Sequence, residues 1–228
     1  MLRFGIELEI IVNPIYIKDL QNRLNDYKSI LIYNPKFNGY LHRDLSIDPN
    51  EMLDYGFEIK TKALEYTEKN IKKFKALYDS LNLIVASNDS CGLHVHASRD
   101  GFSLLDHHAL LHEYIKQGYA KDLTKIDGFD MTEYSYANLN DCKRRYYYPI
   151  NKALRNDEIF YIREWDDNKT SLYKIHYEFN TIEYRGLRHH FETASTETIM
   201  KGIESYLDTM ENLKINKYTR IHIKESRD

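Results

Sequence analysis

Apolar and polar residues alternate at the start of the chain and predict its first strand. Apolar side chains occupy the even positions there, while Arg3, Gly5, Glu7 and Glu9 occupy the odd positions. Because successive side chains of a β-strand point to opposite faces, residues 2–12 are predicted to form a strand with one face in the core. Patterns of the same kind predict a short strand at residues 56–61, a strand pair within 83–98, and strands at 159–165, 172–179 and 181–187.

Other segments carry apolar residues at helical spacing. The stripe formed by Ile71, Phe74 and Leu77 is the clearest, and it belongs to a predicted helix over residues 67–81. Further helices are predicted at residues 17–31, 103–119, 134–154 and 196–213. This order of elements predicts one α+β domain over residues 1–228 with a mainly antiparallel sheet, since the last three strands follow one another too closely for crossover helices.

Composition and charge narrow the classes of protein to consider. The chain has 228 residues, of which 42% are hydrophobic, enough to bury a sizeable core. A formal net charge of −3 gives no electrostatic support for a nucleic-acid partner. No run of residues reads as a signal peptide or a membrane span, so we expect a cytoplasmic protein without membrane contact, in which Cys91 and Cys142 are thiols rather than a disulfide.

Three predicted strands each carry two functional side chains that are two residues apart. The pairs are Glu7 with Glu9, His94 with His96, and Glu183 with Arg185. Strand alternation places both members of each pair on one face, opposite the apolar residues. A solvated sheet face would explain any one pair, but carboxylates that meet across a sheet repel each other unless a cation lies between them. Carboxylates with one or two imidazoles suit Mg²⁺ or Mn²⁺ bound to phosphates.

Two further clusters have competing interpretations. Cys91, His94 and His96 could ligate Zn²⁺. Strand alternation places Cys91 on the opposite face from the two histidines, however, and we favour the interpretation that Cys91 is a small buried apolar residue. Arg144 and Arg145 lie among tyrosines, where they could clamp phosphate or could belong to a solvated helix face.

Two arginines follow Glu183 more closely. Arg185 and Arg188 flank a strand with an expected metal ligand, where phosphate charge would need neutralising. The sequence contains no Walker-type glycine-rich loop, so a bound nucleotide would be held by metal and arginines.

Taken in order, these motifs resemble those of the amidoligase family, which belongs with the glutamine synthetase and γ-glutamylcysteine synthetase-like carboxylate-amine ligases. The resemblance is carried by the segments at residues 4–9, 44–46, 56–61, 91–96, 144–146 and 181–185. The most specific of them are the Gly-Ile-Glu-Leu-Glu start and the Cys-Gly-Leu-His-Val-His segment.

The resemblance implies a curved, mainly antiparallel sheet with helices packed on its outer face and with ATP and Mg²⁺ or Mn²⁺ bound on its concave face. The positions that match metal ligands are Glu7, Glu9, Glu58, His94 and Glu183. The positions that match contacts to ATP or its phosphates are His96, Arg144, Arg145 and Arg185. Catalytic roles are implied for Asp44, Arg145, Arg185 and Arg188. Asp44 or Glu58 is the candidate base, and Asp44 could also be a further metal ligand.

The activity implied is the joining of a carboxylate to an amine through an acyl phosphate made from ATP. The substrates would be small molecules or peptides that carry these groups, and assembly into an oligomer stays open. Two alternatives use the same face: a zinc or two-metal hydrolase that activates water, and a non-catalytic module that binds a peptide or nucleic acid.

Overall fold

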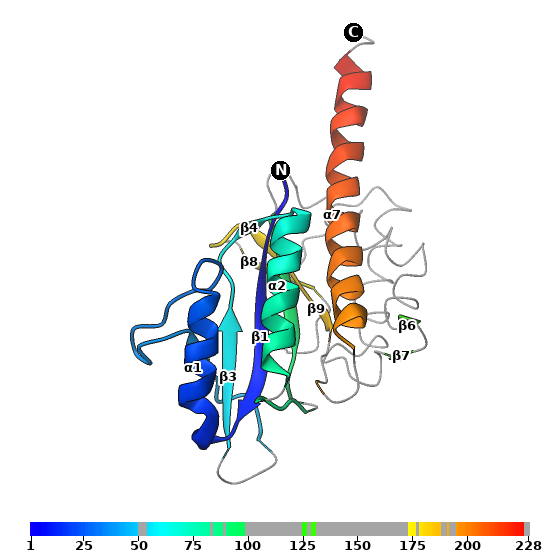
Figure 1. Ribbon diagram of the computed structural model, residues 1–228. Coiled ribbons are helices and arrows are strands. Elements are labelled where there is room, and N and C mark those ends of the chain that lie inside the picture. Colours follow the sequence, from blue (N-terminus) through cyan, green and yellow to red (C-terminus); the bar gives the residue numbers. More distant parts are fainter. Residues whose placement is uncertain are drawn as a thin grey trace.

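The computed structural model describes residues 1–49, 54–82, 84–88, 90–98, 125–126, 129–130, 173–176, 178–187, 191 and 195–225. These residues form an α+β structure with an open antiparallel sheet and helices on one of its faces (Figure 1). No helix in the described part is both long enough and apolar enough to cross a bilayer.

Seven of the described strands form one sheet, in the order β2-β3-β1-β5-β9-β8, with β4 paired to the end of β1. All neighbours in this sheet run antiparallel. Its strands are β1 (Arg3–Val12), β2 (Leu41–Arg43), β3 (Tyr55–Lys60), β4 (Leu64–Glu65), β5 (Leu93–Ser98), β8 (Tyr173–His176) and β9 (Thr181–Leu187). A separate two-stranded sheet consists of β6 (Lys125–Ile126) and β7 (Phe129–Asp130).

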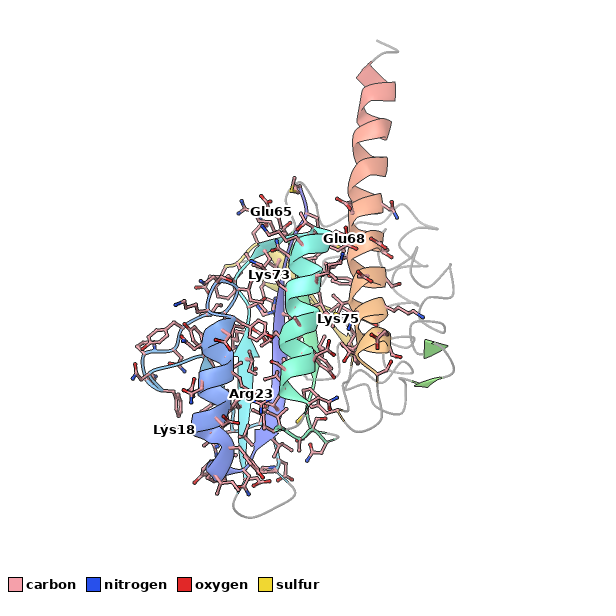
Figure 2. The ribbon with its side chains drawn as sticks, in the orientation of Figure 1. Lys18, Arg23, Glu65, Glu68, Lys73 and Lys75 are labelled. Atoms are coloured by element: carbon pink, nitrogen blue, oxygen red, sulfur yellow. The ribbon has the colours of Figure 1, made fainter. Side chains whose placement is uncertain are left out.

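Three helices lie side by side across one face of the large sheet (Figure 1). They are α1 (Ile17–Asp26), α2 (Glu68–Leu81) and α7 (Thr196–Glu225), and a short 3₁₀ turn, η1 (Pro14–Tyr16), precedes α1. Thr67 begins α2 as its N-cap, because its side chain accepts a hydrogen bond from the backbone N–H of Asn70. Charged side chains such as Lys18 and Glu68 lie on the outer surface of these helices (Figure 2).

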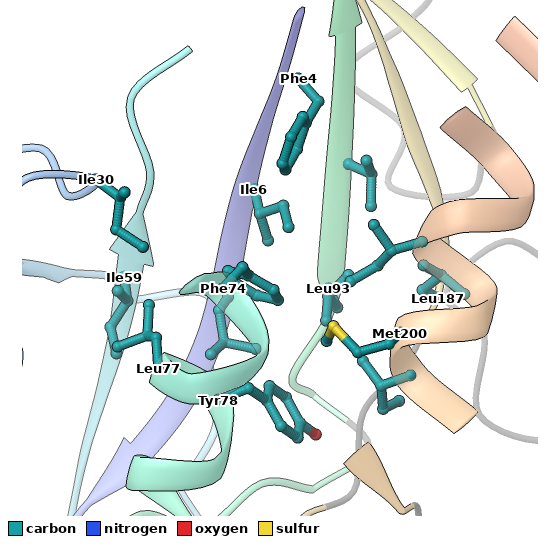
Figure 3. Packing of buried hydrophobic residues seen from close by; sticks show 14 of the residues in the cluster. Phe4, Ile6, Ile30, Ile59, Phe74, Leu77, Tyr78, Leu93, Leu187 and Met200 are labelled. Carbon is teal, nitrogen blue, oxygen red and sulfur yellow. The ribbon is translucent and has the colours of Figure 1, made fainter. Parts of the chain in front are cut away.

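The hydrophobic core fills the space between the sheet and the helices (Figure 3). Phe4 and Ile6 of β1 pack towards Phe74 of α2, and Leu93 of β5 packs towards Met200 of α7. These strand residues are the ones that alternation assigned to the apolar face, and each is almost completely buried. The opposite face of the same strands therefore carries the polar partners of the alternation.

The structure confirms the strands predicted at residues 2–12, 56–61, 172–179 and 181–187 and the helix that contains Phe74, but it corrects several bounds. Helix α1 ends at Asp26 instead of residue 31, because the chain turns there and Leu31 reaches the core from an isolated bridge to Thr61. Helix α7 continues to Glu225 instead of ending at residue 213. In place of the predicted pair, the described residues between 84 and 98 form one strand, β5, and an isolated bridge from Ala86 to Ile11.

Some predicted elements lie outside the described residues, namely the helices at 103–119 and 134–154 and the strand at 159–165. Both strands of the small sheet, β6 and β7, were not predicted, and neither were two short strands of the large sheet, β2 and β4. Each of β2 and β4 has at most three residues and forms only because a longer strand, β3 or β1, lies beside it.

Candidate metal-binding face

The sheet face opposite the helices gathers carboxylates, imidazoles and one lysine from five neighbouring strands. We call it the polar face and define it by Glu7 and Glu9 (β1), Glu58 and Lys60 (β3), His94 and His96 (β5), His176 (β8) and Glu183 (β9). The strand register sets these side chains beside one another: Glu9 lies opposite Glu58, Glu7 lies opposite both Lys60 and His94, and His96 lies opposite Glu183. Side chains directly opposite each other in an antiparallel pair are in contact distance.

Lys60 joins two of the carboxylates. Its Nζ lies 2.6 Å from Glu58 Oε2 and 3.2 Å from Glu7 Oε1. The lysine side chain is 28% exposed and that of Glu58 is 14% exposed, so these ion pairs are only partly screened by water. Lys60 therefore acts as an internal cation at this end of the polar face.

His94 lies between two carboxylates in the middle of the face. Its Nδ1 is 3.1 Å from Glu183 Oε1 and 3.7 Å from Glu7 Oε2, and both His94 and Glu183 are buried. Each of these residues comes from a different strand, so the sheet order β1-β5-β9 is what brings them together.

Glu9 is held by the backbone of the segment before β5. Its Oε2 accepts a hydrogen bond of 2.6 Å from the N–H of Gly92, and its own N–H donates to the Gly92 carbonyl at 3.0 Å. A Cβ at position 92 would come within 2.7 Å of His94 Nε2 and 3.3 Å of Glu9 Oε2. Glycine is therefore required here by a close approach of two site residues.

At the other end of the polar face, His176 contacts the second oxygen of Glu183. His176 Nε2 lies 2.6 Å from Glu183 Oε2, and the rings of His96 and His176 are 5.1 Å apart between centroids. Glu183 thus contacts a different imidazole with each of its two carboxylate oxygens.

Within the described residues, three groups of side chains have ligand atoms close enough together to hold a metal ion, all within 4.8 Å of one another. We name them the carboxylate group (Glu9, Asp44 and Glu58), the central group (Glu7, His94 and Glu183) and the imidazole group (His96, His176 and Glu183). Glu9 and Glu58 are directly opposite each other in the sheet, an arrangement that repels in the absence of a cation. The donor atoms of these groups fit a divalent cation.

The charges of this face shift the protonation of its members. Burial raises the pKa of Glu58 to about 7; Lys60 opposes this rise, and the Glu7 and Asp44 charges add to it. Burial would also raise the pKa of Glu7, but the nearby His94, His96 and Lys60 outweigh it and hold that pKa well below the usual range. Burial would lower the pKa of Lys60, yet the adjacent Glu7 and Glu58 carboxylates raise it, so the ammonium stays charged at neutral pH.

The structure brings most of the sequence-predicted site residues together. The five positions that match metal ligands all contribute to the polar face, namely Glu7, Glu9, Glu58, His94 and Glu183. Their role as ligands stays a prediction. Asp44 lies just after β2, where it joins the carboxylate group, and His96 joins the imidazole group.

The side chains of the predicted arginines lie outside the described part of the structure. Arg144, Arg145 and Arg188 lie outside the described residues, and Arg185 is described only as a backbone position in β9. The ladder between β5 and β9 shifts register so that β9 has one more residue than β5 between the pairs Val95–Tyr184 and Leu93–Leu187. Strict alternation along β9 is therefore interrupted after Tyr184.

Cys91 behaves as predicted for a small buried side chain. It is 0% exposed and packs with Ile11 and Ile47 in a small apolar cluster. In the described part of the chain, none of the groups that could hold a metal contains Cys91. Cys142 lies outside the described residues.

Two members of the polar face were missed from the sequence, Lys60 and His176. The sequence does place both in predicted strands. Lys60 is two residues after Glu58 and therefore on the same strand face, and His176 falls in the predicted strand 172–179. What the sequence lacks is the pairing of β3 with β1 and of β8 with β9, which sets Lys60 beside Glu7 and His176 on Glu183.

Comparison of the sequence with protein-family models and with curated proteins finds no match. The resemblance to the amidoligase family therefore rests on the sequence motifs alone.

Proposed function

We propose that the polar face binds ATP with Mg²⁺ or Mn²⁺ and that the protein is a carboxylate-amine ligase on a curved, glutamine-synthetase-like sheet. One observation carries the proposal most: Glu7, His94 and Glu183, which belong to three separate motifs, converge with their ligand atoms within 4.8 Å. Two carboxylates and one imidazole form a donor set that suits a divalent cation bound to phosphate. Sequence order alone does not require these three motifs to meet.

The carboxylate-rich composition of the face supports a cation-dependent role. Glu9 and Glu183 are almost fully buried, and Lys60 is the one lysine or arginine that contacts the polar face within the described side chains. Burying a carboxylate is costly unless hydrogen bonds or positive charge offset it. Glu9 accepts a hydrogen bond from Gly92 and Glu183 contacts His94 and His176, and a bound cation would add to these contacts. Bound divalent ions would offset the repulsion between neighbouring carboxylates and would polarise the phosphates of ATP as Lewis acids.

In the proposed reaction, each group of residues on the polar face would have a separate role. The central and carboxylate groups would hold the divalent cations to which the triphosphate binds, and Lys60 would stabilise negative charge that develops in phosphoryl transfer. A substrate carboxylate would attack the γ-phosphoryl group and release ADP, and an amine would then displace phosphate from the acyl phosphate. Asp44, at the edge of the carboxylate group, is our candidate for accepting the amine proton.

The arginines enter the proposal through their motifs. Arg185 and Arg188 would contact phosphate oxygens, and Arg144 and Arg145 would contact ATP or the acyl phosphate. Small-molecule or peptide carboxylates and amines remain the proposed substrates.

One observation favours the alternative that the protein is a metal-dependent hydrolase. His96 and His176 add imidazoles to the face, and imidazole-rich sites are common in metal-dependent hydrolases. A hydrolase would cleave its substrate without ATP. A ligase would consume ATP only when a suitable carboxylate is present.

Hydroxylamine trapping tests the proposed reaction whichever amine is the natural acceptor. The full chain is incubated with ATP, Mg²⁺, hydroxylamine and pools of amino acids, dicarboxylates and peptides, and both ADP and acyl hydroxamate are measured. We expect both products from at least one pool, and we expect Glu7→Gln to lower the rate by about 100-fold, since even outer-shell changes at metal sites cost 10- to 100-fold. Glu68→Gln on the exposed surface of α2 is the matched control. Substrate cleavage without ATP would contradict the ligase proposal, and so would ADP release at a rate that does not depend on the added carboxylate.

A further inference from the structure

The donor atoms of the polar face change in kind from one end of the sheet to the other. The carboxylate group offers three carboxylates, the central group offers two carboxylates and an imidazole, and the imidazole group offers two imidazoles and one carboxylate. Mg²⁺ prefers oxygen ligands, whereas imidazole nitrogen suits borderline ions such as Zn²⁺, Co²⁺ and Fe²⁺. The two ends therefore differ in the metal that they fit best.

Glu183 occupies the position between the central and imidazole groups. Its Oε1 lies 3.1 Å from His94 Nδ1, and its Oε2 lies 2.6 Å from His176 Nε2. A carboxylate in this arrangement presents one oxygen to each neighbouring group. It can therefore serve two adjacent cations as a shared ligand.

His96 supplies a second, independent observation that supports a ligand site at the imidazole group. Its Nδ1 is 3.4 Å from Thr181 Oγ1, while its Nε2 is shielded from solvent and has no hydrogen-bond partner among the described residues. That nitrogen lies 3.6 Å from Glu7 Oε1, which is within ion-pair distance but beyond hydrogen-bond distance. Buried polar atoms are almost always satisfied, so this nitrogen indicates a bound group.

We propose that His96, His176 and Glu183 form a second cation site, selective for a borderline transition-metal ion such as Zn²⁺ or Co²⁺ over Mg²⁺, with Glu183 shared with the central group. The ligand atoms lie within 4.8 Å of one another. That span is near the reach of two metal–ligand bonds of about 2.1 Å each, so small side-chain movements complete the site. Three protein ligands leave positions open for water or for a substrate oxygen.

This inference rests on the proposed function only through the shared Glu183. A transition-metal ion can bind the imidazole group whether or not ATP binds the face. Conversely, Mg²⁺-dependent ATP binding can use the central and carboxylate groups with the imidazole group empty. The two proposals therefore fail in separate measurements.

Cobalt titration of the metal-stripped full chain tests the site directly. Co²⁺ is added in the presence of millimolar Mg²⁺, and binding is followed by visible absorption and by equilibrium dialysis. The proton NMR spectrum of the Co²⁺ form reports exchangeable imidazole N–H signals shifted by the metal. The variants are His176→Ala, His176→Gln and, as a matched control, His42→Ala, because His42 belongs to none of the three groups.

We expect the wild type and His42→Ala to bind Co²⁺ despite excess Mg²⁺ and to show signals from two imidazoles. We expect His176→Ala and His176→Gln each to weaken Co²⁺ binding at least tenfold and to lose one imidazole signal. His176→Gln retains a hydrogen-bonding group at this edge strand, so its loss of binding would not be explained by misfolding. Equal Co²⁺ affinity in wild type and both His176 variants would overturn the proposal, as would displacement of Co²⁺ by Mg²⁺ in the wild type. Mg²⁺-dependent ATP binding, measured on the same samples, reports on the proposed function separately.

Discussion

Replacing Gly92 with alanine is expected to weaken the binding of Mg²⁺ or Mn²⁺ by about 10- to 100-fold, the range that a disturbed ligand orientation costs. The added Cβ would lie 2.7 Å from His94 Nε2 and 3.3 Å from Glu9 Oε2. The His94 ring has little room to retreat, because it is 5% exposed and contacts Glu183. The methyl group would therefore displace His94, Glu9 or both, and we also expect a loss of about 1–3 kcal/mol in the free energy of unfolding from overpacking.

Gly5→Ala is the matched control for this change. Gly5 lies on β1, next to His96 in the sheet register, but a Cβ there meets its nearest neighbours only at ordinary contact distances of 3.8 Å or more. Calorimetric titration with Mn²⁺ and urea unfolding should show wild-type metal affinity for Gly5→Ala and a clear loss for Gly92→Ala. Wild-type metal affinity in Gly92→Ala would mean that His94 and Glu9 are not placed as ligands.

Replacing Tyr206 with alanine is expected to lower the free energy of unfolding by about 3–5 kcal/mol, as for other large buried aromatic residues. Tyr206 is 0% exposed on α7, and its ring stacks on that of Tyr184 in β9 with centroids 5.0 Å apart. Its hydroxyl donates a hydrogen bond of 3.0 Å to the carbonyl of Ile182. Because Ile182 and Tyr184 flank Glu183, this contact fixes the strand that carries a central ligand.

Tyr206→Phe separates the ring from the hydrogen bond. It retains the stacked ring and removes only the hydroxyl, so we expect a loss of about 1 kcal/mol. Urea unfolding, followed by circular dichroism, measures both variants under the same conditions. If the two variants were equally stable, the ring of Tyr206 would not support the packing of α7 on β9 in the way that the structure indicates.

Local sequence pattern was sufficient to predict which side chains share a face of the regular part of strands β1 and β5. Glu7 with Glu9 and His94 with His96 are on the polar face because alternation allows nothing else in a regular strand. The apolar partners Ile6, Leu8 and Val95 are buried for the same reason. These features depend only on neighbouring residues, and the structure confirms them.

The convergence of those faces depends on strand pairing between distant segments. Glu7 meets Lys60 and His94, and His176 meets Glu183, only because β1 lies between β3 and β5 and because β8 is paired with β9. The spacing of residues along the sequence does not predict this strand order. For that reason Lys60 and His176 were missed, although both fall in predicted strands.

Departures from regular geometry limited the prediction in other places. The extra residue of β9 interrupts the alternation from which Arg185 was assigned to the face of Glu183. The helix predicted at residues 196–213 continues to Glu225 as α7, because the lysine, glutamate and arginine residues beyond position 213 are good helix formers.

Calorimetric titration of the metal-stripped full chain with ATP, in the presence and absence of Mg²⁺, tests the central claim most directly. The key variant is Glu7→Gln with Glu183→Gln, and the matched control is Glu65→Gln with Glu68→Gln, which removes two exposed carboxylates away from the polar face. We predict Mg²⁺-dependent ATP binding in the wild type and in the control, and its loss in the key variant. Absence of ATP binding under every metal condition, or unchanged binding in the key variant, would contradict the account.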